Sequence, residues 1–101
     1  MGTWFAFTCP GCGYRAEASG GRDIGMLAVV QTSTCGSCRE LVDVVIGYYG
    51  QDGPTGDPEQ DRELGRCPDC GSAAVIPWPE RQPCPKCGNA MEQGGLIALW
   101  D

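Results

Sequence analysis

The pattern of apolar and polar positions predicts short β-strands and no sustained helix. Residues 26–32 (MLAVVQT) and 41–46 (LVDVVI) are rich in β-branched side chains, which favour strands. Two shorter apolar segments, 73–76 and 96–100, are expected to be strands as well. The SGGRDIG segment (19–25) has the composition of a turn. The chain is therefore predicted to be a small, mainly β protein.

Eight cysteines change this picture, because a chain of 101 residues that divides into small units needs a covalent or metal staple. They form four C-x-x-C pairs: Cys9/Cys12, Cys35/Cys38, Cys67/Cys70 and Cys84/Cys87. A tetrahedral zinc site takes four thiolates, so two such pairs complete one ligand shell. We therefore predict that all eight cysteines are metal ligands and that the chain binds two Zn²⁺ ions. The sequence contains no histidine, which favours structural over catalytic zinc.

An acidic run rich in proline and glycine separates the second pair from the third. Its composition is typical of a linker or a long exposed loop. The predicted organisation is a first zinc ribbon at 1–49 (Cys9, Cys12, Cys35, Cys38), a linker at 50–63, and a second ribbon at 64–101 (Cys67, Cys70, Cys84, Cys87).

Four pairs can combine into two sites in three ways: sequential, alternating or nested. Sequential pairing closes the shortest loops, although loop length enters the closure entropy only logarithmically. It would also give each half of the chain its own sheet and its own metal. Sequential pairing is therefore the prediction, with the other two arrangements left as alternatives.

Three of the four cysteine turns share more than the spacing of their thiols. C-P-G-C-G (9–13), C-P-D-C-G (67–71) and C-P-K-C-G (84–88) resemble the knuckles of zinc ribbons and of the related rubredoxin-like proteins. The resemblance implies four-cysteine sites, each built from two β-hairpin knuckles over a three-stranded sheet. The unit C-G-S-C-R (35–39) departs from this pattern, because its glycine lies inside the turn and Arg39 follows the second cysteine.

Iron is an alternative metal at one site. The segment C-P-G-C-G-Y (9–14) resembles the first knuckle of rubredoxin, which pairs with a later C-P-x-C-G across an aromatic-rich segment. Iron and zinc share the tetrahedral four-sulfur geometry. The segment between the first two pairs is aliphatic, so zinc is preferred. Electron transfer by iron at Cys9, Cys12, Cys35 and Cys38 remains the alternative function.

Charge and composition suggest what kind of partner the protein has. The formal net charge of −6 disfavours contact with a nucleic-acid backbone. Four basic residues near the cysteines keep a nucleic-acid-binding zinc ribbon as a second alternative, although they also compensate the charge of the sites: Arg15, Arg39, Arg66 and Lys86. Exposed aromatic residues and the acidic loop instead favour another protein as partner.

No catalytic constellation is visible, so we expect a non-catalytic binding or adaptor module and not an enzyme. The N-terminal segment MGTWFAFTC lacks the basic and apolar regions of a signal peptide. Apolar runs are too short for a membrane span. A cytoplasmic location follows as an expectation, and reduced thiols there favour metal sites over disulfides.

Overall fold

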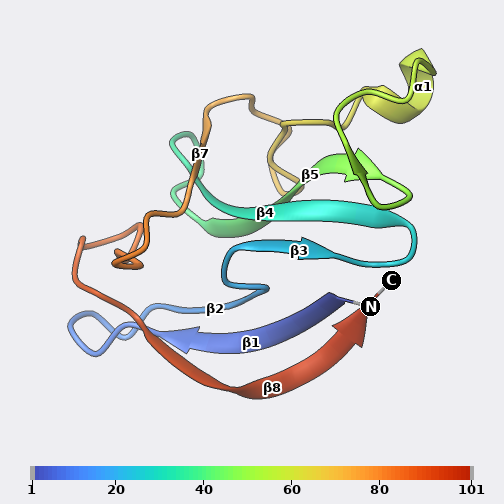
Figure 1. Ribbon diagram of the computed structural model, residues 1–101. Coiled ribbons are helices and arrows are strands. Elements are labelled where there is room, and N and C mark those ends of the chain that lie inside the picture. The colour runs from blue at the N-terminus through green and yellow to red at the C-terminus, as the bar shows by residue number, and fades with distance from the viewer. Residues whose placement is uncertain (1, 101) are drawn as a thin grey trace.

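The protein is small and mainly β, as predicted, in a computed structural model that describes residues 2–100 (Figure 1). Its elements are β1 (Gly2–Thr8), β2 (Arg15–Ala18), β3 (Arg22–Ile24), β4 (Ala28–Cys35), β5 (Leu41–Tyr48), β6 (Gln51–Asp52), α1 (Pro58–Asp61), β7 (Val75–Pro77) and β8 (Glu92–Trp100). In the part of the chain that is described, no helix is long and apolar enough to cross a membrane.

The first and last strands of the chain lie side by side in a three-stranded antiparallel sheet with the order β2-β1-β8. The pairing of β1 with β8 runs from Gly2 opposite Trp100 to Thr8 opposite Glu92, with two register shifts. The indole of Trp100 lies over Gly2, where any larger side chain would collide with it. Both ends of the chain therefore contribute to one sheet.

The middle of the chain forms a five-stranded sheet around β4 and β5, with β3, β6 and β7 at its edges. β4 and β5 contain most of the two β-branched runs that were predicted as strands. The prediction of a simple turn at 19–25 was wrong, because residues 22–24 form β3 and pair with β4. Asp23 holds this strand against β1 by accepting a hydrogen bond from the Thr3 N–H at 2.8 Å.

The acidic segment 50–63 contains local structure and is more than a linker. Asp57 caps the short helix α1 by accepting a hydrogen bond from the Glu59 N–H, and Pro58 occupies its first turn. The Asp61 carboxylate accepts hydrogen bonds from the N–H groups of Thr55 and Gly56. These bonds hold the pKa of Asp61 below its ordinary value. The segment is thus a loop organised by its own carboxylates.

Both sheets draw strands from both predicted modules, so the chain does not fold as two consecutive ribbons. β1 from the first half pairs with β8 from the last nine described residues, and β4 pairs with β7. In Figure 1 the two sheets form two layers, with the chain passing from one to the other. The predicted division into ribbons at 1–49 and 64–101 is therefore wrong, because each of the two layers takes strands from both halves of the chain.

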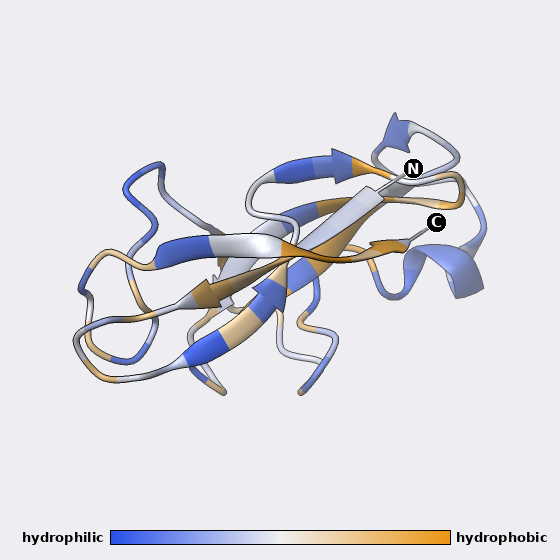
Figure 2. Cartoon of the chain, turned by 90° about the horizontal axis from the view of Figure 1, so that it is seen from below, coloured by the Kyte–Doolittle hydropathy of each residue, from blue (hydrophilic) through white to orange (hydrophobic). Residues whose placement is uncertain are grey.

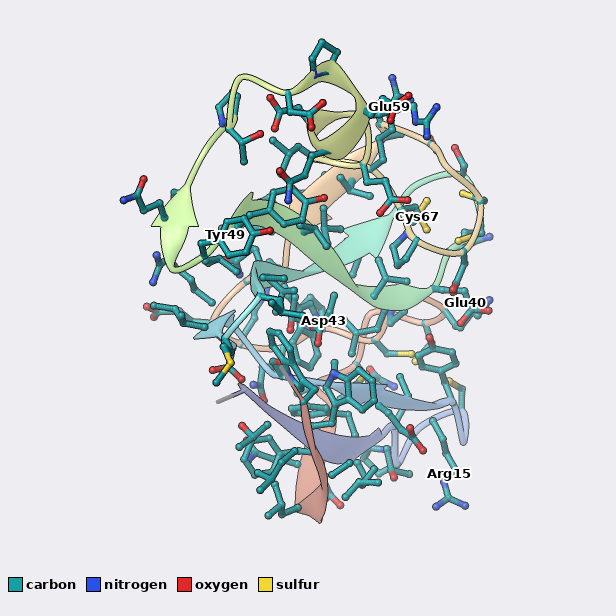
Figure 3. All side chains as sticks on the ribbon, turned by 90° about the vertical axis from the view of Figure 1, so that its right-hand side faces the viewer. Arg15, Glu40, Asp43, Tyr49, Glu59 and Cys67 are labelled. Atoms are coloured by element: carbon teal, nitrogen blue, oxygen red, sulfur yellow. The ribbon has the colours of Figure 1, made fainter. Side chains whose placement is uncertain are left out.

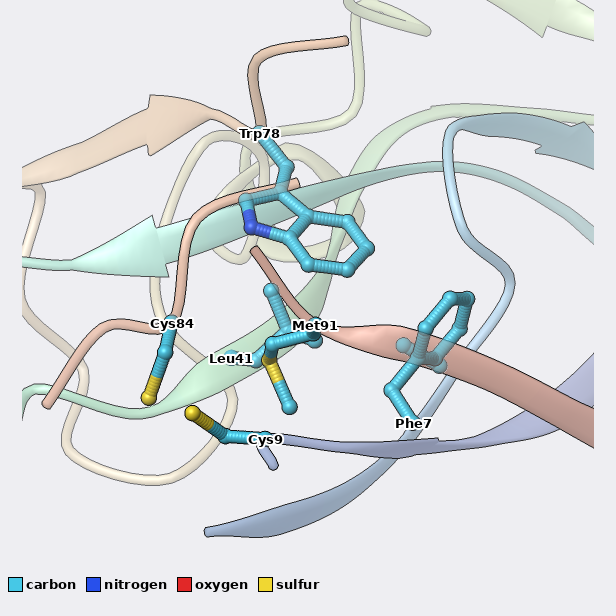
Figure 4. Packing of buried hydrophobic residues seen from close by; sticks show 7 residues of the cluster. Phe7, Cys9, Leu41, Trp78, Cys84 and Met91 are labelled. Carbon is cyan, nitrogen blue, oxygen red and sulfur yellow. The ribbon is translucent and has the colours of Figure 1, made fainter. Parts of the chain in front are cut away.

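Two apolar clusters support these layers. The larger contains Phe7, Cys9, Ala18, Leu41, Trp78, Cys84 and Met91, drawn in Figure 4. In it, the Phe7 and Trp78 rings meet edge to face, with centroids 5.0 Å apart. The smaller contains Cys35, Val42, Val44 and Cys67. Each cluster includes two of the eight cysteines.

The Asp43 carboxylate is a second connection between the two sheets, beside Asp23. Asp43 of β5 accepts hydrogen bonds from the Trp4 indole N–H of β1 at 3.0 Å and from the Ser19 N–H and hydroxyl. It also accepts one from the Thr32 hydroxyl of the neighbouring strand β4. Figure 3 shows Asp43 between the layers. Its acceptor oxygens therefore satisfy donors from both sheets.

Candidate metal centres

The eight cysteines gather into two groups of four, and the grouping is nested. The outer site consists of Cys9, Cys12, Cys84 and Cys87. The inner site consists of Cys35, Cys38, Cys67 and Cys70. The predicted ligands therefore do form two four-cysteine clusters, but the sequential pairing was wrong. A site of Cys9, Cys12, Cys35 and Cys38, where iron was considered, is not formed.

The sulfur positions fit a tetrahedral metal. Four thiolates at about 2.3 Å from one ion lie about 3.8 Å from one another. The outer site has Sγ–Sγ distances of 3.4 Å between Cys9 and Cys87 and 3.6 Å between Cys12 and Cys84. In the inner site, Cys35 and Cys70 are 3.6 Å apart, and Cys38 and Cys67 are 3.7 Å apart. Within each site all four sulfurs lie within 4.8 Å of one another.

All four cysteine turns have one backbone pattern. The N–H of the first cysteine donates to the carbonyl five residues later, over distances of 2.7 to 3.0 Å. The N–H of the residue after the second cysteine donates to the carbonyl of the first, at 2.8 to 2.9 Å. The unusual C-G-S-C-R turn follows the same pattern. Its departure from the zinc-ribbon sequence therefore does not change its hydrogen bonds.

Arg39 takes the place that glycine has in the other three turns. Gly13, Gly71 and Gly88 have φ angles of 81°, 77° and 84°, and Arg39 has φ of 57°. A residue with a Cβ pays steric energy in this left-handed region, whereas glycine does not. The inner site therefore contains one strained position that its sequence motif already indicated.

Backbone N–H groups favour the thiolate form of the first cysteine in two turns. At Cys35, the N–H of Cys38 outweighs burial and lowers the pKa to about 6. Burial raises the pKa of Cys9, but the N–H groups of Cys12 and Gly11 and the Cys87 thiol together lower it to about 7. Both thiols therefore lose their protons to solvent more readily when a metal binds, because a coordinating thiol is deprotonated.

Long-range packing explains why the nested arrangement is adopted. Sequential pairing would save about 1–2 kcal/mol of loop-closure free energy, because the outer site joins residues 72 positions apart. Burying Phe7, Trp78 and Met91 in one core contributes about 1.5–3 kcal/mol for each large side chain. The β1–β8 ladder adds its own hydrogen bonds. These contributions exceed the small advantage of the shorter loops.

The sites have different surroundings. Cys9 and Cys84 point toward each other beside Leu41 and Met91, in the same cluster as Phe7 and Trp78 (Figure 4). The Trp78 indole N–H donates to the Pro83 carbonyl at 2.8 Å, just before Cys84. The core of the inner site is aliphatic. The outer site is therefore the one with an aromatic environment.

Sequence reasoning missed a polar group that lies between the sites. The Tyr14 hydroxyl donates to Glu40 at 2.6 Å, and Lys86 forms an ion pair with the same carboxylate at 3.4 Å. The Tyr14 hydrogen bond is the main cause that lowers the pKa of Glu40, and burial is the main cause that raises the pKa of Tyr14. The only sequence signal was that all three residues lie within two positions of a cysteine.

The basic residues near the cysteines are partly engaged within the protein. Lys86 contacts Glu40 and lies over the Tyr14 ring, 5.6 Å from its centroid. The Arg66 guanidinium donates to the Gly71 carbonyl at 3.2 Å. These contacts favour a local role for the two side chains over nucleic-acid contact.

The fold and the site together define a small β protein with two four-cysteine centres suited to metal binding. No known family model, curated protein or solved structure shows significant similarity to the chain.

Proposed function

We propose that the protein binds two zinc ions, one in each four-cysteine site, and that both have a structural role. The grouping of four sulfurs at tetrahedral spacing in each site carries this proposal. Four thiolates fill the coordination shell of zinc, so they leave no open position for a substrate. Metal binding would then supply folding free energy, of order 10 kcal/mol for each site, to a protein with two small cores.

Elemental analysis of the purified, reduced protein tests the metal and its ligands together. We expect about two zinc ions per chain. The double variant Cys12→Ser/Cys84→Ser removes two ligands of the outer site and should retain one zinc. The matched variant Cys12→Ser/Cys35→Ser removes one ligand from each site and should weaken both. Sequential pairing predicts the reverse, so the two variants distinguish the arrangements.

The protein, stabilised by these zinc sites, would be a non-catalytic adaptor module that contacts another protein through β8. This strand lies at the edge of its sheet, where only β1 pairs with it among the described strands. Leu96, Ile97 and Leu99 are 56%, 45% and 56% exposed. Figure 2 shows the strand becoming hydrophobic toward its C-terminal end. An exposed apolar edge strand can accept a strand from a partner.

Substitutions on the two sheets test the adaptor role. Leu96→Lys should abolish capture of a protein partner while the zinc content stays the same. Ile76→Lys is the matched control, because Ile76 is 63% exposed on β7 of the other sheet. Equal binding by both variants would contradict a role for β8. Recovery of nucleic acid in place of protein would favour the nucleic-acid alternative.

Iron at the outer site is a second candidate, and one observation favours it. The structure pairs the rubredoxin-like knuckle 9–14 with a C-P-x-C-G knuckle, 84–88, and places Phe7 and Trp78 in the adjoining core. This combination of two regular knuckles and nearby aromatic residues resembles that of rubredoxin-like proteins. An iron ion there would exchange one electron between its ferric and ferrous states.

Colour and metal content decide between the two metals. Protein produced with excess iron would be coloured if the outer site takes ferric iron, because thiolate ligands give it strong visible absorption. Cys87→Ser should then remove the colour, whereas Cys70→Ser in the inner site should not. A colourless protein with two zinc ions would exclude the iron candidate.

A further inference from the structure

Glu40 belongs to a turn of the inner site, but its carboxylate contacts both halves of the outer site. It lies two positions after Cys38. Its Oε2 accepts a hydrogen bond of 2.6 Å from the Tyr14 hydroxyl, and its Oε1 lies 3.4 Å from Lys86 Nζ. Tyr14 follows the first outer turn, and Lys86 lies inside the second. One carboxylate therefore joins three of the four cysteine turns.

The backbone beside Glu40 strengthens this connection. The Tyr14 hydroxyl accepts a hydrogen bond of 2.9 Å from the Leu41 N–H, and Leu41 is buried in the same core as Cys9 and Cys84. On its other side, the Glu40 carbonyl accepts the Cys35 N–H at 3.0 Å and so closes the inner turn. Residues 40 and 41 therefore take part in both sites at once.

We propose that Glu40 is a positioning residue that couples the two sites, so that metal binding at either one strengthens binding at the other. Metal in the inner site fixes the turn that carries Glu40. The fixed carboxylate then holds Tyr14 and Lys86, and with them the two outer turns, at the separation that the metal requires. The inference rests on the proposed function, because both sites must bind metal. Such coupling is reciprocal by thermodynamic necessity.

Loop closure alone provides a baseline for this coupling. The outer site joins Cys12 and Cys84 across 72 positions, and a closed inner site bypasses 29 of them. The shorter effective loop raises the affinity of the outer site by roughly two- to threefold. The charge-assisted hydrogen bonds of Glu40 should raise the metal affinity of the outer site further, so we expect a total coupling of about tenfold or more. The excess over the baseline is the contribution assigned to Glu40.

The test measures zinc affinity of the outer site by competition with a chelator, in reduced full-length protein. The wild type is compared with Cys67→Ser/Cys70→Ser, in which the inner site is removed. The ratio of the two affinities is the coupling, and we expect it to be about tenfold or more. With Glu40→Ala in both backgrounds, the ratio should fall to the two- to threefold of loop closure. Glu40→Gln, which retains an acceptor for Tyr14, should give an intermediate ratio.

Matched variants separate positioning from a general loss of stability. Tyr14→Phe keeps the ring and removes only the hydroxyl, so it should lower the coupling in the same way as Glu40→Ala. Glu63→Gln changes an exposed carboxylate four positions before Cys67 and should leave the coupling unchanged. Co²⁺ substituted for zinc should show the same tetrahedral absorption bands in the Glu40, Tyr14 and Glu63 variants as in the wild type, because these changes leave all eight cysteines in place.

The outcomes distinguish this inference from the proposed function. A wild-type protein that binds two zinc ions with coupling unaffected by Glu40→Ala and Tyr14→Phe overturns the inference and leaves the zinc sites in place. A wild-type protein that binds fewer than two metals overturns the proposed function itself. Coupling that falls equally in Glu63→Gln would show a general charge effect and would also overturn the role of Glu40.

Discussion

The outer and inner sites each consist of four cysteines in turns with the same backbone hydrogen bonds, but they depend on different parts of the chain. The outer site brings together turns whose cysteines are up to 78 positions apart, and it lies against an aromatic core. The inner site joins turns on either side of the acidic loop and lies against aliphatic side chains. The C-x-x-C motif therefore specifies the local turn, whereas packing specifies which other turn it meets.

The largest effect on metal content and on hydrogen exchange is expected when one buried thiol is removed from one site or from the other. Cys84 and Cys67 are equivalent first cysteines, 3% and 2% exposed. Cys84→Ser should release the outer metal, expose the amides of β1 and β8 to hydrogen exchange, and retain a metal at the inner site. Cys67→Ser should release the inner metal and expose β4 and β5. Each change removes metal-binding free energy of order 10 kcal/mol.

Metal content and amide exchange of the two variants check this expectation. Ser37→Ala and Ser72→Ala are the controls, because the hydrogen bond between these two hydroxyls is exposed and involves no cysteine. If Cys84→Ser instead released the thiols of Cys35 and Cys38, the nested grouping would be refuted.

The second largest effect is expected from truncating side chains in the two cores, which should lower the free energy of unfolding by different amounts. Trp78→Ala removes a side chain that is 7% exposed, packs edge to face on Phe7 and donates to the Pro83 carbonyl. We expect the free energy of unfolding to fall by about 3–5 kcal/mol. Val44→Ala in the core of the inner site removes two buried methyl groups, and should lower it by about 2 kcal/mol.

Denaturant titration of metal-loaded protein measures both changes. Ile76→Ala is the control, because this side chain is largely exposed and its truncation should change stability little. Equal losses for Trp78→Ala and Val44→Ala would remove the distinction between an aromatic outer core and an aliphatic inner core.

The two central strands and the cysteine turns were predictable from the sequence because their signals are local. β-branched runs predicted β4 and β5, and the C-x-x-C spacing predicted that the eight cysteines gather into two groups of four. The pairing of turns was not predictable in the same way. Loop length distinguishes the arrangements by only about 1–2 kcal/mol, and contacts such as Phe7 with Trp78 outweigh it.

A signal for the nested arrangement was present in the strands at the two ends of the chain. β1 contains the aromatic residues Trp4, Phe5 and Phe7, and the second half of β8, residues 96–100, is apolar, so each strand gains from a partner strand. The polar connections had weaker signals, because an isolated charge such as Asp43 or Glu40 does not indicate which distant donor it meets. The contacts of these residues follow from the tertiary arrangement, which a single sequence does not reveal.

Removal of the two carboxylates that connect the sheets, Asp43 and Asp23, should lower the free energy of unfolding by amounts that differ less. Asp43→Ala leaves donors on Trp4, Ser19 and Thr32 without their acceptor, so we expect a loss of about 2–3 kcal/mol. Asp23→Ala removes acceptors for two N–H groups at a more exposed position, and the expected loss is about 1 kcal/mol. Thermal unfolding of both variants checks the order. A larger loss for Asp23→Ala would show that β3, and not Asp43, is the main connection between the sheets.

The smallest expected effect concerns the one turn without its glycine. Arg39 has φ of 57° where the other turns have glycine, and its N–H donates to the Cys35 carbonyl as theirs do to the corresponding cysteine. Arg39→Gly removes the steric strain and keeps this hydrogen bond, so we expect the inner site to gain about 1 kcal/mol. Gly88→Ala makes the converse change in the outer site, where no atom lies within 4 Å of the added Cβ, and should destabilise it by a similar amount. Zinc affinity and denaturant titration measure both variants, and opposite signs are required. A loss of stability in Arg39→Gly would mean that the Arg39 side chain stabilises its turn by more than the strain costs.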